Sequence, residues 1–207
     1  MTVQVMLISP ALNASLREAR FDGDAPIDPA GARRARAAAP AVPVADRYVR
    51  GPSARCTGTA DALGLHTDPE LSLRDWDMGR WTGQRLAEVG TNEPDAVSAW
   101  LTDPSAAPHG GESLLEFCAR VGHWLKSVGT FGAPEESMQH LDGDAGGRVL
   151  GVVGPAVVRA VTVQALALPT EAFWRLDVAP LTLTTLSGRS GRWNLRCGQP
   201  LSPTAGN

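Results

Sequence analysis

The sequence predicts an α/β fold, a three-layer α/β/α sandwich built around a central, mostly parallel sheet. Two short, mostly apolar runs, Val3–Ile8 and "RVLGVVG" at 148–154, are typical of strands buried on both faces. Each run is followed by a proline within two residues, so the chain turns sharply where each strand ends. Segments of helical composition alternate with the strands, which favours parallel pairing with helices on both faces.

The first half of the chain is predicted to alternate helix and strand. Asp28 can cap a helix that has Pro29 at its first position, and the alanine-rich stretch as far as Ala39 favours that helix. "ADRYVRG" at 45–51 is predicted to be a second strand, and "ARCTGTADALGL" a helix that stops at Gly64. The tryptophan-containing stretch at 69–86 is expected to be a loop.

In the second half, a helical excursion is expected over 92–108, followed by the clearest helix of the chain. Ser113 and Glu116 form the Ser-x-x-Glu capping box that opens this helix. Its apolar face is predicted to carry Leu114, Phe117, Val121, Trp124 and Leu125. We expect a surface-loop insertion around 129–147, a helix beginning at Pro155, and final strands joined around residues 187–191. The whole chain, 1–207, is predicted to be one domain.

Composition limits the classes of partner. The chain has 207 residues, is 43% hydrophobic and carries a formal net charge of −3, which predicts a globular protein and gives no reason to expect a nucleic acid or a membrane surface as partner. The three cysteines, Cys56, Cys118 and Cys197, form no CxxC pair, which favours reduced thiols and a cytoplasmic location. No signal peptide, membrane span, cofactor motif or metal-ligand spacing is recognisable.

Several motifs in one order resemble the histidine phosphatase superfamily, the phosphoglycerate-mutase-like group. They are "VMLISPALN", "PSARCTGTA" around Arg55, "DMGRWTG" at 77–83, "GGES" at 110–113 and "VLGVVGPAVVRA". The resemblance extends from about residue 3 to residue 196. It implies a phosphoglycerate-mutase-like α/β sandwich.

The resemblance also implies roles for particular positions. In the family, the first strand leads to an arginine, a nucleophilic histidine and a glycine, which correspond here to Ser9, Pro10 and Ala11. The second phosphate-binding arginine corresponds to Arg55 and the leaving-group acid to Asp75.

The second catalytic histidine corresponds to Gly154, which Pro155 follows. Since proline has no nucleophilic side chain, the phosphohistidine mechanism is not expected. Loss of a nucleophile from a concerted site costs about a millionfold in turnover. We therefore predict that the protein is not a histidine-dependent phosphatase or mutase, and that p-nitrophenyl phosphate is not hydrolysed. The main hypothesis is a non-catalytic pseudophosphatase that binds a small molecule or a protein partner.

Two alternatives remain open. One is an enzyme of another class that uses Asp75, Arg55 and His109 in the ancestral pocket; the other is a residual phosphate-ester hydrolase in which water attacks directly. Asp75 and Arg55 are the catalytic candidates if the protein is an enzyme. The candidate ligand-binding residues are Ser9, Pro10, Ala11, Asn13, Arg55, Asp75, His109, Glu112, Gly154 and Pro155.

The expected ligand is a small molecule with one anionic or polar group. No cofactor and no metal site is predicted. The oligomeric state is not determined by the sequence, with a dimer as one candidate.

Overall fold

A computed structural model describes residues 2–128, 147–189 and 191–201. Its sheet has six strands in the order β3-β2-β4-β1-β5-β6. The strands are β1 (Val3–Ile8), β2 (Arg47–Arg50), β3 (Asp68–Pro69), β4 (Arg148–Val152), β5 (Thr182–Arg189) and β6 (Arg192–Pro200). The pairings β2–β3, β2–β4 and β1–β4 are parallel, whereas β1–β5 and β5–β6 are antiparallel. The predicted α/β class is confirmed, with an antiparallel edge added to a parallel centre.

Strands β1 and β4 end side by side. Ile8 is opposite Val152 in the parallel pairing, and the amide of Val153 donates to the carbonyl of Ile8 at 3.0 Å. The chain leaves the sheet through Ser9-Pro10 on one strand and Gly154-Pro155 on the other. The two loops therefore open at the same edge of the sheet, where α/β proteins form their ligand sites.

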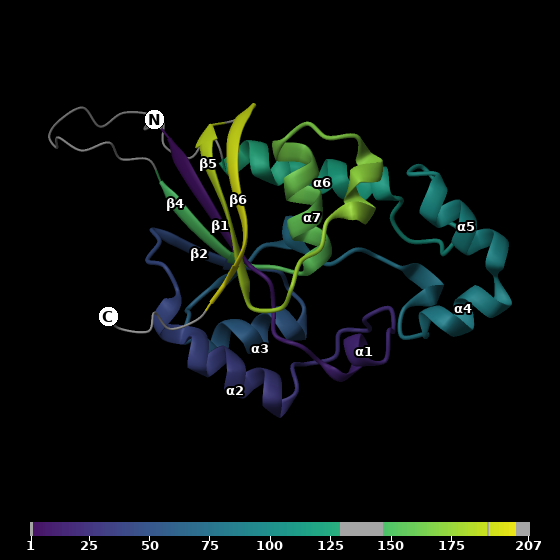
Figure 1. Ribbon diagram of the computed structural model, residues 1–207, viewed down its shortest axis with the longest axis horizontal. Helices are drawn as coiled ribbons and strands as arrows, with labels where there is room; N and C mark the ends of the chain where they lie inside the picture. The colour runs from purple at the N-terminus through teal and green to yellow at the C-terminus, as the bar shows by residue number, and fades with distance from the viewer. Residues whose placement is uncertain (1, 129–146, 190, 202–207) are drawn as a thin grey trace, which may run out of the picture.

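Helices cover both faces of the sheet (Figure 1). On one face lie α2 (Pro29–Ala38) and α3 (Ala54–Ala62), and on the other lie α6 (Leu114–Val128) and α7 (Pro155–Ala165). Successive residues of β1 serve both faces: Val5 and Leu7 belong to the core under α6 and α7, whereas Met6 and Ile8 belong to the core over α2 and α3. This double burial is why the strand lacks an alternating polar pattern.

The predicted helix starts are confirmed by their hydrogen bonds. The Asp28 carboxylate accepts from the amide of Gly31 at 2.6 Å. The Ser113 hydroxyl accepts from the amide of Glu116 at 3.2 Å, and the Glu116 carboxylate accepts from the amide of Ser113 at 2.8 Å. Both caps satisfy donors that have no partner inside their helix.

The helical excursion expected over 92–108 contains α5 (Pro94–Thr102), whereas α4 (Leu86–Asn92) lies before the predicted range. The two helices form a separate lobe (Figure 1). It covers a third apolar cluster, whose buried members are Met78, Trp81, Val89 and Trp100, with Phe21, Trp76, Ala96, Val97 and Trp174 packed against them. The tryptophan-containing stretch that we expected to be only a loop thus supplies part of a core.

Three local features differ from expectation. Helix α1 (Ala14–Arg17) and the two-residue strand β3 were not predicted, and both are too short to produce a periodic pattern. The final strands were expected to begin at Phe173, but Phe173 belongs to a 3₁₀ turn, Thr170–Arg175, and is buried in the core under α6 and α7.

The proposed surface loop falls mostly outside the described residues, and the single-domain assignment stays a prediction. No helix in the described ranges is long and apolar enough to cross a membrane.

Candidate functional site

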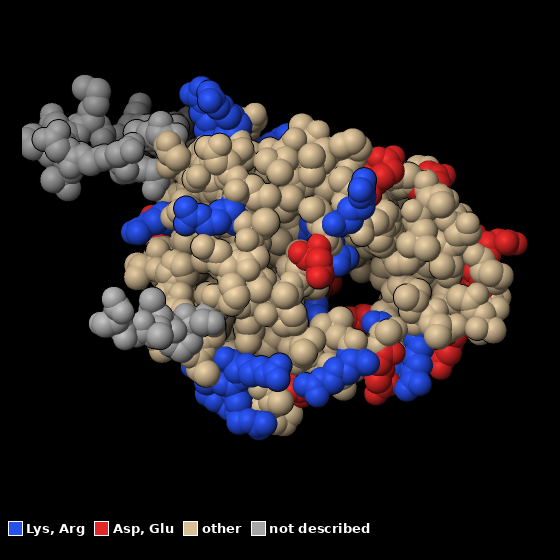
Figure 2. All heavy atoms as spheres, in the orientation of Figure 1, with Lys and Arg blue, Asp and Glu red and all other residues tan. Residues whose placement is uncertain are grey.

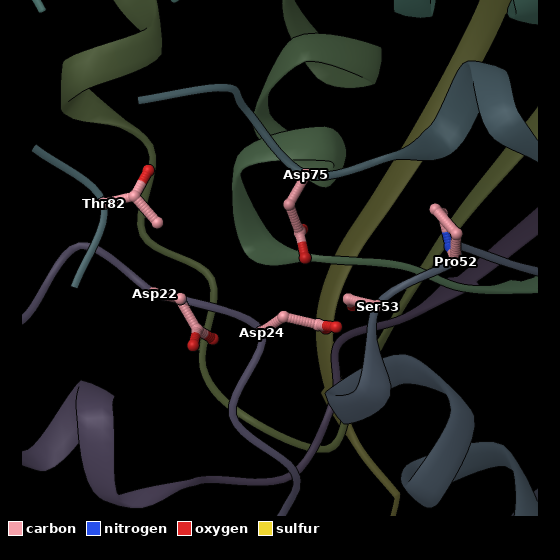
Figure 3. Close-up of a pocket in the computed structure, with 7 residues that line it drawn as sticks. Asp22, Asp24, Pro52, Ser53, Asp75 and Thr82 are labelled. Atoms are coloured by element: carbon pink, nitrogen blue, oxygen red, sulfur yellow. The ribbon is translucent and has the colours of Figure 1, made fainter. Parts of the chain in front are cut away.

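Two adjoining cavities open at the carboxyl edge of the parallel strands. The first, here called the acidic cleft, encloses about 380 Å³ and is lined by Asp22, Gly23, Asp24, Pro52, Ser53, Asp75 and Thr82 (Figure 3). The second, here called the aromatic chamber, encloses about 270 Å³ and is lined by Leu16, Arg20, Phe21, Asp22, Arg55, Asp75, Trp76, Met78, Trp100, Pro155, Ala156, Arg159, Phe173 and Trp174. Asp22 and Asp75 belong to both linings and thus stand between the cavities. The molecular surface is visibly hollowed between the sheet-bearing body and the lobe of α4 and α5, with both acidic and basic atoms at the margin (Figure 2).

Asp75 occupies the space that a side chain at position 154 would need. A Cβ atom built on Gly154 would lie only 1.8 Å from Oδ1 of Asp75. The glycine therefore allows the carboxyl group to reach the end of β4, and any larger residue there must displace it. This contact explains, in this fold, why a glycine at 154 and an aspartate at 75 are compatible with each other.

The environment of Asp75 favours its protonated form. Burial raises the pKa of the Asp75 carboxyl, and the negative charges of Asp22 and Asp24 raise it further. The Arg55 guanidinium and the Ser53 hydroxyl act in the opposite direction and lower the pKa, but the net shift is upward. A carboxyl group with this balance can hold a proton and donate it within the cavity.

Arg55 lies in the first turn of α3 and its side chain is only 4% exposed. Its Nε atom forms an ion pair with Oδ2 of Asp22 at 3.5 Å, a contact too poorly aligned to be a hydrogen bond. Within the described part of the chain, Nε and Nη1 of Arg55 have no hydrogen-bond acceptor. A buried guanidinium with unmet donors is suited to donate hydrogen bonds to the oxygens of an anion.

Asn13 acts on the site through Asp22. Its Nδ2 donates to Oδ2 of Asp22 and to the carbonyl of Ala25, both at 3.0 Å, while its Oδ1 caps α1 by accepting from the amide of Leu16. All of these contacts are with the protein itself. Asn13 lines neither cavity and positions the carboxylate that faces Arg55.

The residues that follow β1 are absent from the linings of the two cavities. The Ser9 hydroxyl donates to the carbonyl of Ala179 and accepts from the amide of Thr182 at 3.1 Å, so it joins β1 to the start of β5. The amide of Ala11 donates to the Thr59 hydroxyl at 3.1 Å, and Pro10 is buried. Ser9, Pro10 and Ala11 are therefore placed as connections within the fold, and no described base contacts the Ser9 hydroxyl.

His109 and Glu112 also lie outside both linings. His109 is 1% exposed, and its Nδ1 accepts from the amide of Gly111 at 3.0 Å. Burial lowers the pKa of the His109 imidazole, which favours its neutral form. Glu112 accepts two hydrogen bonds from Arg120, both at 2.7 Å, and one from Arg74 at 2.7 Å. These contacts indicate that both residues stabilise the loop before α6.

Of the ten candidate ligand-binding residues, the structure brings Arg55, Asp75, Gly154 and Pro155 together. Four other residues at this site were not selected from the sequence: Asp22, Asp24, Trp100 and Arg159. The segment "FDGDAP" carries a recognisable signal, since two acids flank a glycine next to turn residues. Arg159 lies four residues after Pro155, so the two share one face of α7.

The carboxylates of the acidic cleft do not amount to a metal centre. Throughout the described ranges, no group of three or more His, Cys, Asp or Glu side chains is arranged to hold a metal ion. What the site does bring together is a buried cation, a proton-donating carboxyl group and an aromatic wall.

The fold and this edge-of-sheet site define the chain as an α/β protein of the phosphoglycerate-mutase-like class. The sequence model of the histidine phosphatase superfamily (branch 1) matches residues 11–198. The chain belongs to the histidine phosphatase superfamily.

Sequence and structure relatives are consistent with this assignment. The glucosyl-3-phosphoglycerate phosphatase of Mycolicibacterium vanbaalenii is 32% identical over 124 residues, which cover 56% of this chain and 52% of the relative. The protein of the same name from Mycobacterium tuberculosis is 37% identical over 60 residues, 29% of this chain and 27% of the relative. The matches thus span about half or less of the length of these curated relatives.

Two solved structures share the fold over nearly the full length. A mycobacterial glucosyl-3-phosphoglycerate phosphatase superposes with a TM-score of 0.78 at 23% identity, covering 98% of this chain and all of the other. A putative alpha-ribazole-5'-P phosphatase from Escherichia coli superposes with a TM-score of 0.81 at 17% identity, covering 99% of each chain.

These comparisons correct the functional hypothesis drawn from the sequence. The prediction of a non-catalytic pseudophosphatase is wrong, because the relatives that match carry the names of phosphatases. The hypothesis depended on the side chains missing at positions 9, 10 and 154. Arg55 and Asp75 were named from the sequence as catalytic candidates only for the alternative readings, and the structure shows both of them buried at one site.

Proposed function

We propose that the protein hydrolyses the phosphate monoester of a small molecule, with water as the nucleophile. Arg55 would hold the phosphoryl oxygens and Asp75 would protonate the leaving oxygen. The observation that carries the proposal is the pairing of a buried guanidinium that has unmet donors with a neighbouring carboxyl group of raised pKa. Relatives named glucosyl-3-phosphoglycerate phosphatase and alpha-ribazole-5'-P phosphatase support the same class of reaction.

The reaction needs little from the protein beyond these two groups. In phosphoryl transfer the bond to the leaving oxygen is largely broken in the transition state, so stabilising charge and protonating that oxygen matter more than activating the nucleophile. Water forms the new P–O bond while the ester P–O bond breaks. The proton of Asp75 passes to the leaving oxygen, and a proton of the attacking water, which enters opposite that oxygen, is released to solvent.

Direct attack by water is consistent with the residues on β1. Pro10 has no nucleophilic group, and the Ser9 hydroxyl is engaged with backbone groups of the segment before β5. The acidic cleft is lined by Asp22 and Asp24 besides Asp75, and the negative charge of these two aspartates disfavours entry of an anion. The phosphate would then approach from the side of the aromatic chamber, where Arg55 lies.

The test is phosphate release from phenyl phosphate by the purified protein and by Asp75→Asn. Since a positioned acid contributes about 10²–10⁴-fold, we expect kcat to fall at least a hundredfold in the variant. Asp61→Asn is the matched control, because Asp61 is an exposed residue of α3 that lines neither cavity. An acid-stable or acid-labile phosphoenzyme trapped at stoichiometric level, or an unchanged kcat in Asp75→Asn, would contradict the proposal.

A further inference from the structure

The unmet hydrogen-bond donors of the described chain converge on the aromatic chamber. Five buried side-chain N or O atoms lack a partner among the described residues, and four of them belong to residues that line this chamber. They are Nε and Nη1 of Arg55, Nε1 of Trp100 and Nε of Arg159. All four are donors and none is an acceptor. Because an unmet buried donor is costly, this arrangement is completed best by a ligand that is rich in acceptors.

Arg159 is a second cation in the chamber, on a different element from Arg55. It lies on α7, one turn after Pro155, and its guanidinium carbon is 5.7 Å from the centroid of the Phe173 ring. It forms no ion pair with a carboxylate of the described residues. Burial lowers the pKa of Arg159 and the charge of Asp177 only partly compensates. A desolvated guanidinium of this kind gains most from an anion that enters the chamber.

The walls of the chamber are suited to a flat ring. Trp174 contacts Trp100 edge-on at 4.7 Å between centroids, and Trp76 lies 5.8 Å from Trp174 and 5.5 Å from Phe173. The described lining contains no Ser, Thr, Asn, Gln, Tyr or His, so it has no neutral polar side chain for the hydroxyls of a sugar apart from indole N–H groups. Aromatic walls of this kind favour stacked and edge-on ring contacts.

The charges of the lining favour a ligand with two anionic groups. Three arginines face two aspartates, and one of these aspartates, Asp75, is the group whose protonated form is favoured. Arg20 is already engaged, since its Nε pairs with Glu18 and its Nη1 donates to the carbonyl of Gly83, both at 2.9 Å. Arg55 also pairs with Asp22 at 3.5 Å, but its Nε and Nη1 make no hydrogen bond. Arg55 and Arg159 are therefore the two arginines with donors left for the ligand.

We infer that the aromatic chamber binds the organic part of the substrate, and that this part is an aromatic ring carrying a second anionic group held by Arg159. This inference rests on the proposed function, in which Arg55 holds the phosphate, and it specifies the class of substrate. An aryl phosphate with a carboxylate on the ring has the required features. The carboxylate and the phosphate lie at opposite ends of a ring that stacks against the tryptophans.

The test compares two esters that differ by one carboxylate, phenyl phosphate and 4-carboxyphenyl phosphate. We expect the wild-type protein to have a KM about tenfold lower for the carboxylated ester, the size of one charge-assisted contact. Arg159→Gln should abolish that preference, so that the ratio of the two KM values falls to about one. Arg159→Lys, which keeps the charge, should retain part of it. Arg175→Gln is the control, because Arg175 is exposed on the adjacent 3₁₀ turn and lines neither cavity.

Binding of the leaving groups separates this inference from the proposed function. Calorimetry with 4-hydroxybenzoate and with phenol reports on the chamber even if neither ester is hydrolysed. If 4-hydroxybenzoate binds more tightly than phenol and this difference is lost in Arg159→Gln, the inference is supported. If the same result is found but neither ester is hydrolysed, the chamber binds as inferred and only the proposed function fails. Equal binding of the two compounds, or equal binding by wild type and folded Arg159→Gln, would overturn the inference whether or not phosphate is released.

Discussion

The acidic cleft and the aromatic chamber share a wall but have opposite characters. The charged residues that line the cleft are three aspartates, whereas the chamber carries three arginines, three tryptophans and two phenylalanines. Asp75 stands in the shared wall, where burial and the two other aspartates raise its pKa and Arg55 lowers it. The comparison shows how the pKa of one carboxyl group can be raised although a cation lies beside it: burial and the negative charges of the cleft raise it, and the chamber supplies the anion site.

The largest effect should come from Arg55, the only residue named above as a ligand for the phosphate. Arg55→Ala is expected to lower kcat/KM by about a thousandfold, because it removes the preorganised donors that stabilise charge in the transition state. Arg55→Lys should recover little of this loss, since an ammonium group cannot reproduce the planar fork of donors. The measurement is phosphate release with Arg36→Ala as control, an exposed arginine of α2. Activity near that of the wild type in Arg55→Ala would show that the chamber does not take part in the reaction.

Asp75→Asn should separate activity from stability. The folded state raises the pKa of Asp75 above its unfolded value, so over that interval the folded state binds the proton and the unfolded state does not. The free energy of unfolding of the wild type should therefore fall as pH rises from the unfolded pKa through the raised, folded pKa. The asparagine variant lacks this loss and should be the more stable protein at neutral pH, although it is nearly inactive.

Urea denaturation of both proteins over a pH series measures this difference. Wild-type activity should also decline as pH rises through the pKa of Asp75, because the general acid loses its proton. Parallel stability curves for wild type and Asp75→Asn would show that the carboxyl group is not perturbed by the cleft.

Gly154→Ala tests the contact that keeps Asp75 in the shared wall. The new Cβ would lie 1.8 Å from Oδ1 of Asp75, so the carboxyl group has to move. We expect a loss of about tenfold or more in kcat, since small displacements of a catalytic group are costly. Gly90→Ala is the control, because a Cβ there meets no atom within 4 Å. Full activity in a folded Gly154→Ala protein would mean that the position of the carboxyl group is not critical.

The same contact limits what restoration of the family residues can achieve. A histidine at position 154 would displace the Asp75 carboxyl group, as an alanine would. The triple change Ser9→Arg, Pro10→His and Gly154→His therefore restores the family's phosphate-binding arginine and both histidines but moves the acid away from its position. We expect folded protein with weak activity at best, measured against ordinary phosphate esters.

The sequence predicted the sheet, the main helices and the juxtaposition of the β1 and β4 loops, because buried strands and helix caps are encoded by neighbouring residues. Motif order identified Arg55 and Asp75. It could not predict that the Ser9 hydroxyl bonds to the backbone before β5, that His109 Nδ1 accepts from the amide of Gly111, or that Glu112 pairs with Arg120. Those contacts join segments far apart in the chain. The aromatic chamber was missed for the same reason: Trp76, Trp100 and Trp174 come from three separate segments and meet only in the folded protein.

The smallest effect should come from Asp24, which acts on Asp75 only through charge. Its carboxylate accepts from the amide of Ala54 at 2.6 Å, and its backbone φ of 66° lies in the left-handed region that asparagine tolerates well. Asp24→Asn therefore keeps the hydrogen bond and the backbone conformation while it removes one negative charge from the cleft.

The pKa of Asp75 should be raised less in Asp24→Asn than in the wild type, so the pH at which activity declines should move downward. The readout is the position of that limb in a pH profile, at low ionic strength where charge interactions are least screened. Asp61→Asn should leave the limb in place. If Asp24→Asn also leaves it in place, or moves it upward, the negative field of the cleft is not what keeps Asp75 protonated, and burial alone must account for it.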